Sequence, residues 1–169
     1  VVIPVYIPNQ EGYFRDGFEV LKLCLNSLFK TTHNKTFITI VNNGSCLLVE
    51  NYLNVIHKQG KIQELIHTHN IGRVNANLKG ISGYKFPIVT LTDADVLFLN
   101  NWQNETYDVF DSFPKAGAVC PTPSPRSLRT YTSNVYWDCF FSKKLKIREV
   151  VNPYALRNFA VSVGNDKFY

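Results

Sequence analysis

The stretch Ile88-Val89-Thr90-Leu91-Thr92-Asp93-Ala94-Asp95-Val96-Leu97-Phe98-Leu99 places two acidic residues inside an apolar run that is rich in β-branched side chains. A short apolar run of this kind predicts a buried strand. Aspartate is uncommon in strands, and a buried carboxylate is costly unless a partner compensates its charge. Asp93 and Asp95 at the end of such a strand therefore indicate a binding site, and a divalent cation is a partner that favours carboxylate oxygens.

The composition is that of one globular domain, with 169 residues of which 45% are hydrophobic. The net charge of +5 fits an anionic ligand, although an ordinary basic surface is the commoner explanation. The four cysteines, Cys24, Cys46, Cys120 and Cys139, have no metal-binding spacing and are typical of reduced thiols in a cytosolic protein. No apolar run reaches the roughly 20 residues of a membrane-spanning helix. The chain has no methionine and begins at Val1, which suggests a segment of a longer protein.

Strand and helix signals alternate along the first two thirds of the chain. We expect strands at residues 1–6, 37–41, 62–67, 88–99 and 118–120, and helices at 18–32, 45–60, 70–84 and 101–113, with Ser45 capping the second helix. In the fourth helix we expect Trp102, Thr106, Val109, Phe110 and Phe113 to face inward. Such alternation predicts a largely parallel sheet with helices on both faces. Beyond the proline-rich loop at 121–127, residues 132–142 are expected to form a further strand.

Polar residues follow three of the expected strands, in Tyr6-Ile7-Pro8-Asn9, Asn42-Asn43-Gly44-Ser45 and Thr92-Asp93-Ala94-Asp95. Ligands of open parallel sheets bind in the crevice outside the carboxyl ends of the strands. We therefore expect these three segments to meet at one edge of the sheet and to form one site.

Five segments in register resemble the family 2 glycosyltransferases, which have the GT-A fold. They are the opening strand Val1-Val2-Ile3-Pro4-Val5-Tyr6, the helix from Phe18 to Thr32, the turn Ile40-Val41-Asn42-Asn43-Gly44-Ser45, the pair Asn70-Ile71-Gly72 and Gly80-Ile81, and the strand end Thr92-Asp93-Ala94-Asp95-Val96, which matches the DxD motif. The resemblance implies an α/β domain with a mostly parallel central sheet and helices on both faces. It also implies a nucleotide-sugar-binding half at residues 1–99 and an acceptor-side half at 116–169.

The resemblance implies a metal-dependent, inverting hexosyltransferase that uses a nucleoside diphosphate sugar, UDP- or GDP-linked, and a saccharide or other hydroxyl acceptor. Asp95 would be the direct ligand of Mn²⁺ or Mg²⁺, and Asp93 would contact the donor or assist with the metal. Pro4, Val5, Tyr6, Asn42 and Asn43 would hold the nucleobase. A plain turn and helix cap is the alternative explanation of Asn42-Asn43-Gly44-Ser45 when that segment is taken alone.

Two departures from the family pattern affect the donor site. The family usually has aspartate where Asn42 stands, and an amide both donates and accepts hydrogen bonds. In place of the family's "ARN" in the third helix the chain has Ala76-Asn77-Leu78. Arg73, one turn earlier, is the candidate for a positive charge on the donor phosphates, with a plain surface arginine as the alternative.

An inverting transfer needs a general base that deprotonates the acceptor hydroxyl. The segment Gly164-Asn165-Asp166 resembles the family's acidic motif, so Asp166 is the candidate catalytic base and Asp138 the alternative. A loop acid near the end of the chain is the competing explanation of Asp166.

Two other functions remain open at this level. One is a nucleotidyltransferase, which also uses paired acids and a metal; the other is a non-catalytic or truncated module that only binds nucleotide. A cytoplasmic protein is expected. The basic run Lys143, Lys144, Lys146 and Arg148 indicates either a solvated surface or contact with phosphates at the inner face of a membrane, without nucleic acid as a partner.

Overall fold

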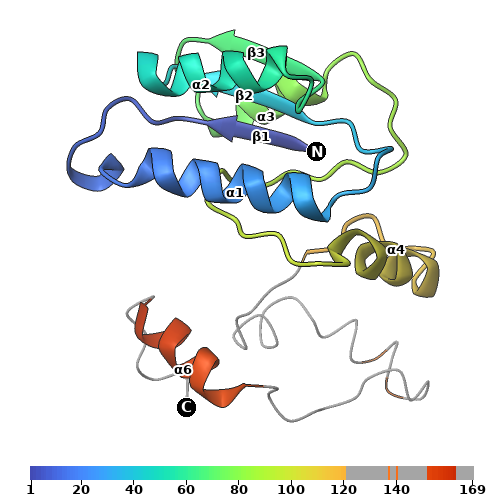
Figure 1. The fold of residues 1–169 in the computed structure, drawn as a ribbon. Helices are drawn as coiled ribbons and strands as arrows, with labels where there is room; N and C mark the ends of the chain where they lie inside the picture. Colours follow the sequence, from blue (N-terminus) through green and yellow to red (C-terminus); the bar gives the residue numbers. More distant parts are fainter. Residues whose placement is uncertain (121–136, 138–139, 141–151, 163–169) are drawn as a thin grey trace. The chain divides into compact units, whose positions relative to one another are not determined.

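The structure is a computed structural model that describes residues 1–120, 137, 140 and 152–162. The chain forms two compact units, Val1–Pro114 and Lys115–Tyr169 (Figure 1). The first unit holds all the strands described below. Of the second unit, the structure describes one complete helix, α6 (Pro153–Ser162).

The first unit is built on a parallel sheet of three strands in the order β1-β2-β3. The strands are β1 (Val2–Val5), β2 (Thr39–Asn43) and β3 (Glu64–Thr68). The α-helices are α1 (Gly17–Thr31), α2 (Leu47–Lys58), α3 (Arg73–Ile81) and α4 (Trp102–Ser112), and η1 (Gly12–Phe14) is a short 3₁₀ helix. Strand and helix alternate from β1 to α3, as the sequence predicts.

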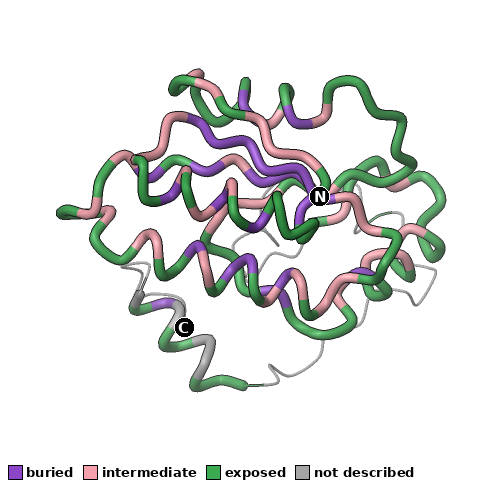
Figure 2. The backbone as a smooth tube through the Cα atoms, turned by 45° about the horizontal axis from the view of Figure 1, so that its top comes forward, coloured by how far each residue is buried: buried purple, intermediate pink, exposed green. Residues whose placement is uncertain are grey.

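Helices cover both faces of this sheet. On one face Ile3, Val5 and Ile40 pack against the apolar stripes of α1 and α2. On the other face Val2 and Val41 pack against Ala76 of α3. Adjacent strand residues point to opposite faces, and both faces are covered, which explains why β1 and the centre of β2 are continuously apolar rather than alternating. The buried backbone in Figure 2 follows the strands and the inner sides of the helices. The predicted parallel sheet with helices on both faces is thus confirmed for β1, β2 and β3.

The prediction that residues 88–99 form a buried strand is wrong. The segment pairs with β1 through one parallel bridge between Val2 and Leu91, in which the Val2 N–H donates to the Thr90 carbonyl at 2.9 Å. Ile88, Val89 and Leu91 are 39%, 38% and 51% exposed. The physical reason is position: within the described residues no strand pairs with the outer side of this segment, so its apolar side chains are not covered.

The acidic end of this segment is nevertheless anchored to α1. Phe98 is buried and its ring lies 5.0 Å from that of Trp102. Its backbone N–H donates to Ser27 Oγ at 3.0 Å, and the Cys24 thiol contacts the Asp93 carbonyl at 3.8 Å. Two side chains of one helix therefore fix the backbone on both sides of Asp95.

Several element boundaries and faces differ from the predictions. β2 begins two residues later than expected and α3 ends at Ile81. Residues 118–120 are not a strand. In α4 the buried residue is Gln103, while Val109 and Phe113 are exposed. The burial of the Gln103 amide is compensated by two hydrogen bonds: it accepts the His33 N–H at 2.9 Å and donates to Thr36 Oγ1 at 2.9 Å.

Much of the region after Cys120 lies outside the described residues, including the loop at 121–127, Asp138 and the basic run at 143–148. Of the predicted strand at 132–142 the structure describes only Trp137 and Phe140, and both are helical, so the prediction is wrong at these two positions. Among the helices of the described ranges, none combines the length and apolar character that crossing a membrane would require.

Candidate functional site

The carboxyl ends of β1 and β2 are joined by the side chain of Ser45. Its Oγ accepts the Ile7 N–H at 3.0 Å and donates to the Val5 carbonyl at 3.2 Å. The Cys46 N–H also donates to the Ile7 carbonyl at 2.8 Å. The prediction that Ser45 caps α2 is therefore wrong: Cys46 is the N-cap residue, and Ser45 instead ties the turn after β2 to the chain after β1.

Asn42 starts a chain of polar side chains that runs from β2 to α2. Its Oδ1 accepts the Ser45 N–H at 3.0 Å, and its Nδ2 lies 3.0 Å from Nδ1 of His67. The other ring nitrogen of His67, Nε2, lies 3.2 Å from Oδ1 of Asn54. Asn42 is only 3% exposed, so these partners compensate the burial of its amide.

Asn43 points to the other face of the sheet and sets the start of α3. Its Oδ1 accepts the Ile71 N–H at 2.9 Å, and its Nδ2 donates to Asn70 Oδ1 at 3.2 Å. Gly44 follows with a φ of +88°, and a Cβ at this position would lie 2.9 Å from the Asn70 backbone nitrogen. The turn after β2 therefore requires glycine, both for its conformation and for its contact with the loop before α3.

Arg73, the first residue of α3, reaches the acidic segment. Its Nη2 lies 2.7 Å from Oδ1 of Asp93 and 2.9 Å from Oδ2. The two side chains are 70% and 45% exposed. An exposed ion pair contributes only about 0–1 kcal/mol to stability, so an anionic ligand can compete for this arginine at little cost.

Asp95 is exposed and lies two residues further along. Ala94, which lies between the two acids, packs against the core. Within the described part of the chain the Asp95 carboxylate forms no ion pair or hydrogen bond. Burial raises the pKa of the neighbouring Cys24 thiol to about 11, and the Asp95 charge adds to this, so the thiol is protonated at neutral pH.

Comparison with protein families gives one result that decides the class of this chain. The sequence model of glycosyl transferase family 2 matches residues 1–162, nearly the whole chain. The chain belongs to this family. Comparison with curated proteins gives no significant match. The parallel sheet covered by helices is the α/β, GT-A-like fold expected of a family 2 domain, and family membership supports glycosyltransferase activity in general.

Asp93 and Asp95 suit a metal site in which the phosphates of a bound ligand supply some of the metal's ligands. Among the residues that the structure describes, no three His, Cys, Asp or Glu side chains form a ready ligand cluster. Mg²⁺ is usually bound by one or two carboxylates together with substrate phosphates and water. The unpaired Asp95 carboxylate matches this mode, whereas Asp93 is engaged by Arg73.

The other site residues expected from the family 2 resemblance fall into two groups. Val5 pairs with Asn42 in the strand register, with Tyr6 and Asn43 directly after them, and Pro4 lies within β1. Asp166 lies outside the described residues. Sequence reasoning missed the supporting roles of Ser45, His67 and Asn54. The strand register places His67 beside Asn42, and no motif in the sequence reveals that pairing.

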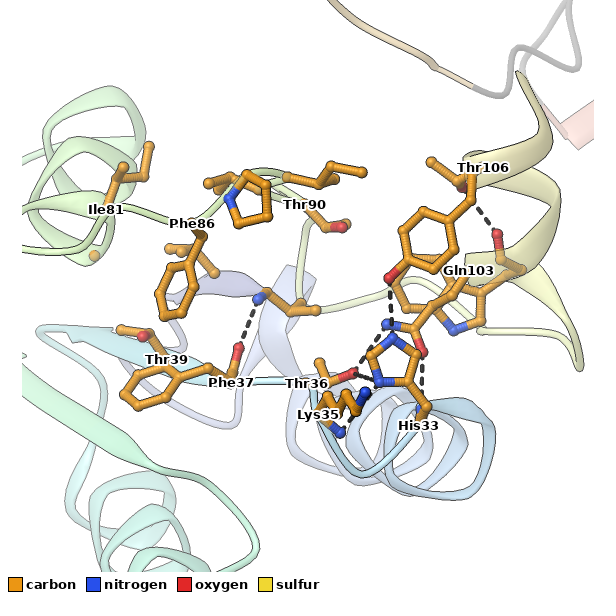
Figure 3. Close-up of a pocket in the computed structure, with 18 residues that line it drawn as sticks. His33, Lys35, Thr36, Phe37, Thr39, Ile81, Phe86, Thr90, Gln103 and Thr106 are labelled. Atoms are coloured by element: carbon orange, nitrogen blue, oxygen red, sulfur yellow. Dashed lines mark hydrogen bonds between the residues drawn. The ribbon is translucent and has the colours of Figure 1, made fainter. Parts of the chain in front are cut away.

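A cavity of about 370 Å³ lies at the opposite edge of the sheet (Figure 3). It is lined by Val2 and Thr39 at the starts of β1 and β2, with Phe86 on one side and the hydrogen-bonded His33 and Gln103 on the other. Ligands of parallel α/β sheets bind at the carboxyl ends of the strands, so this cavity is not the candidate site of the family 2 domain.

Proposed function

We propose that this chain is a metal-dependent glycosyltransferase that moves a sugar from a nucleoside diphosphate sugar to an acceptor hydroxyl with inversion at the sugar carbon. The observation that carries the proposal is the cluster at the carboxyl edge: the exposed Asp95 carboxylate lies two residues from Asp93, which Arg73 already contacts. Two carboxylates and a guanidinium at the carboxyl edge of the sheet suit a ligand that combines a diphosphate with hydroxyl groups.

The nucleoside would bind at the ends of β1 and β2. Tyr6 is 41% exposed, and Asn42 and Asn43 end the neighbouring strand. An aromatic ring next to an amide suits a nucleobase, which has a flat apolar face and a polar edge. Pro4 and Val5 would support this subsite from within β1.

The diphosphate and sugar would lie toward Arg73, Asp93 and Asp95. The Arg73 guanidinium would exchange part of its contact with Asp93 for phosphate oxygens, which it can bind with several donors at once. The freed Asp93 carboxylate would accept hydrogen bonds from the sugar or ribose hydroxyls. Asp95, with Asp93 assisting, would hold Mn²⁺ or Mg²⁺, and the metal would offset the negative charge that develops on the leaving diphosphate.

The acceptor hydroxyl would lose its proton to a carboxylate on the opposite side of the sugar. We assign this role to Asp166, because Gly164-Asn165-Asp166 resembles the family's acidic motif and single displacement requires a base for the acceptor hydroxyl. Attack by that oxygen forms the new glycosidic bond as the bond to the diphosphate breaks. We place the enzyme in a reducing compartment such as the cytoplasm, because Cys24 and Cys46 are free thiols that form no disulfide with any described residue.

The test is nucleotide binding in the presence of the metal. The midpoint of thermal unfolding is measured with UDP, GDP, CMP and dTDP, each with and without Mn²⁺, for the wild type and for Asp95→Asn. We expect at least one nucleoside diphosphate to raise the midpoint only when Mn²⁺ is present, because binding to the folded state alone stabilises it. Asp95→Asn should abolish this increase.

Asp111→Asn is the matched control, since Asp111 is an exposed carboxylate on α4. It should respond to nucleotide and Mn²⁺ as the wild type does. An undiminished increase in Asp95→Asn would remove Asp95 from the metal site. Slow metal-dependent release of sugar from the donor, measured with the wild type, would distinguish a working transferase from a module that only binds.

A further inference from the structure

We propose that Ser27 of α1 is a positioning residue of the metal site, and that it acts by holding the backbone of the segment that carries Asp95. The inference rests on the proposed function, since it needs Asp95 to bind a metal. Ser27 would not touch the metal or the nucleotide. It would set where the Asp95 carboxylate lies before either of them binds.

The short stretch from Asp95 to Leu97 is held by little packing of its own. Asp95 is exposed, and Val96 and Leu97 are 38% and 66% exposed. The residues on either side of this stretch differ, because Ala94 packs against the core and Phe98 is buried. The position of the Asp95 carboxylate therefore depends on how the backbone is held at these two ends.

Ser27 holds the far end through its hydroxyl group. The Phe98 backbone N–H donates to Ser27 Oγ at 3.0 Å. The same hydroxyl donates to the Cys24 carbonyl of its own helix at 2.7 Å, so its hydrogen is engaged there and its oxygen is available to the segment. The Phe98 ring is held by packing against Trp102, with ring centroids 5.0 Å apart. The hydrogen bond adds the direction in which the backbone leaves that contact.

Cys24, one turn before Ser27, holds the near end. Its sulfur lies 3.8 Å from the Asp93 carbonyl oxygen. Burial raises the pKa of the thiol to about 11, and a hydrogen bond from the Val96 backbone N–H acts in the opposite direction. The thiol thus contacts backbone groups on both sides of Asp95. A thiol is a weak donor and a weak acceptor, so the hydroxyl of Ser27 makes the stronger attachment.

The expected consequence is a change in metal affinity. Groups that orient a metal ligand from outside the coordination shell contribute about 10–100-fold to affinity. Without the Ser27 hydroxyl, the Phe98 N–H loses its acceptor and the stretch that carries Asp95 is free to take more conformations. Metal binding would then have to restrict that freedom, which weakens it.

The experiment compares Ser27→Val with Ser27→Thr. The two side chains have nearly the same shape, but only threonine keeps the hydroxyl, and in a helix this group can still bond to the carbonyl of the preceding turn. Thr31→Val is the matched control, since it removes a hydroxyl of α1 that donates to the Ser27 carbonyl at 2.8 Å and not to the segment. Calorimetry measures UDP and GDP binding at increasing Mn²⁺ concentration, at a temperature at which every variant is folded.

We expect Ser27→Val to need about tenfold more Mn²⁺ than the wild type for half of the full gain in nucleotide affinity. Ser27→Thr and Thr31→Val should need the same amount as the wild type. A loss of stability alone does not change this requirement while the protein stays folded, so the comparison separates positioning from a merely structural role.

Two kinds of result would contradict the proposal. If the wild type needs Mn²⁺ and Asp95→Asn removes that dependence, but Ser27→Val behaves as the wild type or Ser27→Thr is as weak as Ser27→Val, the positioning role is overturned and the proposed function stands. A wild type that binds neither UDP nor GDP in the presence of Mn²⁺ overturns the proposed function and the role of Ser27 together.

Discussion

Gly80 fixes how closely α3 approaches the sheet, and Gly80→Ala tests that contact. A Cβ at position 80 would lie 2.4 Å from Val2 Cγ1 and 3.0 Å from Val41 Cγ2. Carbon atoms in good contact are about 3.5–4.0 Å apart, so the added methyl overlaps Val2 by about 1 Å. Both valines are buried and have stiff, β-branched side chains, so the helix rather than the side chains has to move.

The expected loss of stability follows from two opposing effects. Overpacking of a close contact costs about 1–3 kcal/mol, and an overlap with two stiff side chains belongs at the upper end of that range. Alanine has a better helix propensity than glycine by about 1 kcal/mol. We therefore expect Gly80→Ala to lower the free energy of unfolding by about 2 kcal/mol, measured by urea denaturation.

Gly17→Ala is the control for this measurement. Gly17 is the first residue of α1, and a Cβ there would lie 3.4 Å or more from the nearest side-chain atoms of Ile7, which is ordinary contact. This variant should be as stable as the wild type or slightly more stable. If Gly80→Ala were equally stable, the close packing of α3 on β1 and β2 would be refuted.

Three further changes test other parts of the site and core. Gly44→Ala should lower the free energy of unfolding by at least about 2 kcal/mol in urea denaturation, because its φ of +88° strains alanine and its Cβ would press on the Asn70 backbone. Arg73→Gln should change stability by less than about 1 kcal/mol, because its ion pair with Asp93 is exposed, yet weaken the binding of a nucleoside diphosphate about tenfold in calorimetry. Burial raises the pKa of Tyr52 above 10.0, so the folded state resists its ionisation and stability should fall as the pH rises past 10. Tyr52→Phe should make that fall shallower, as measured by urea denaturation at stepwise pH.

Periodicity and turn residues predicted the sheet and the helices on its two faces because burial imposed those patterns directly. β1 and β2 are buried on both faces, β1 is apolar throughout and β2 is apolar at its centre, and α1 shows its stripe at Leu21, Leu25 and Leu28. The segment 88–99 has the same apolar character but lies at the edge of the described sheet. Composition cannot distinguish an edge from a centre, since that difference depends on which strand pairs on the outer side.

The sequence pattern indicated the candidate site residues that stand out locally. It missed the residues whose roles depend on which segments the fold brings together. Asp93, Asp95 and the turn at Asn42 stand out as polar residues beside apolar runs. The roles of Ser45 and His67 arise from contacts with Ile7 and Asn42 that are distant in sequence. A serine between a strand and a helix is typical of an N-cap. The local pattern therefore predicted that Ser45 would bond to the first turn of α2, whereas it bonds to the backbone after β1.

Arg73 lies one turn before the position at which the family pattern has an arginine in α3. Asn77 stands where the family's "ARN" motif has arginine, and its Oδ1 is buried without a hydrogen-bond partner among the described residues. Arg73 lies four residues earlier, about 6 Å nearer the start of the helix and on the same face. That displacement moves the charge toward the carboxyl edge, where it meets Asp93 at 2.7 Å. The first turn of α3 therefore places a positive charge beside the acidic segment, although the family's motif position holds asparagine in this chain.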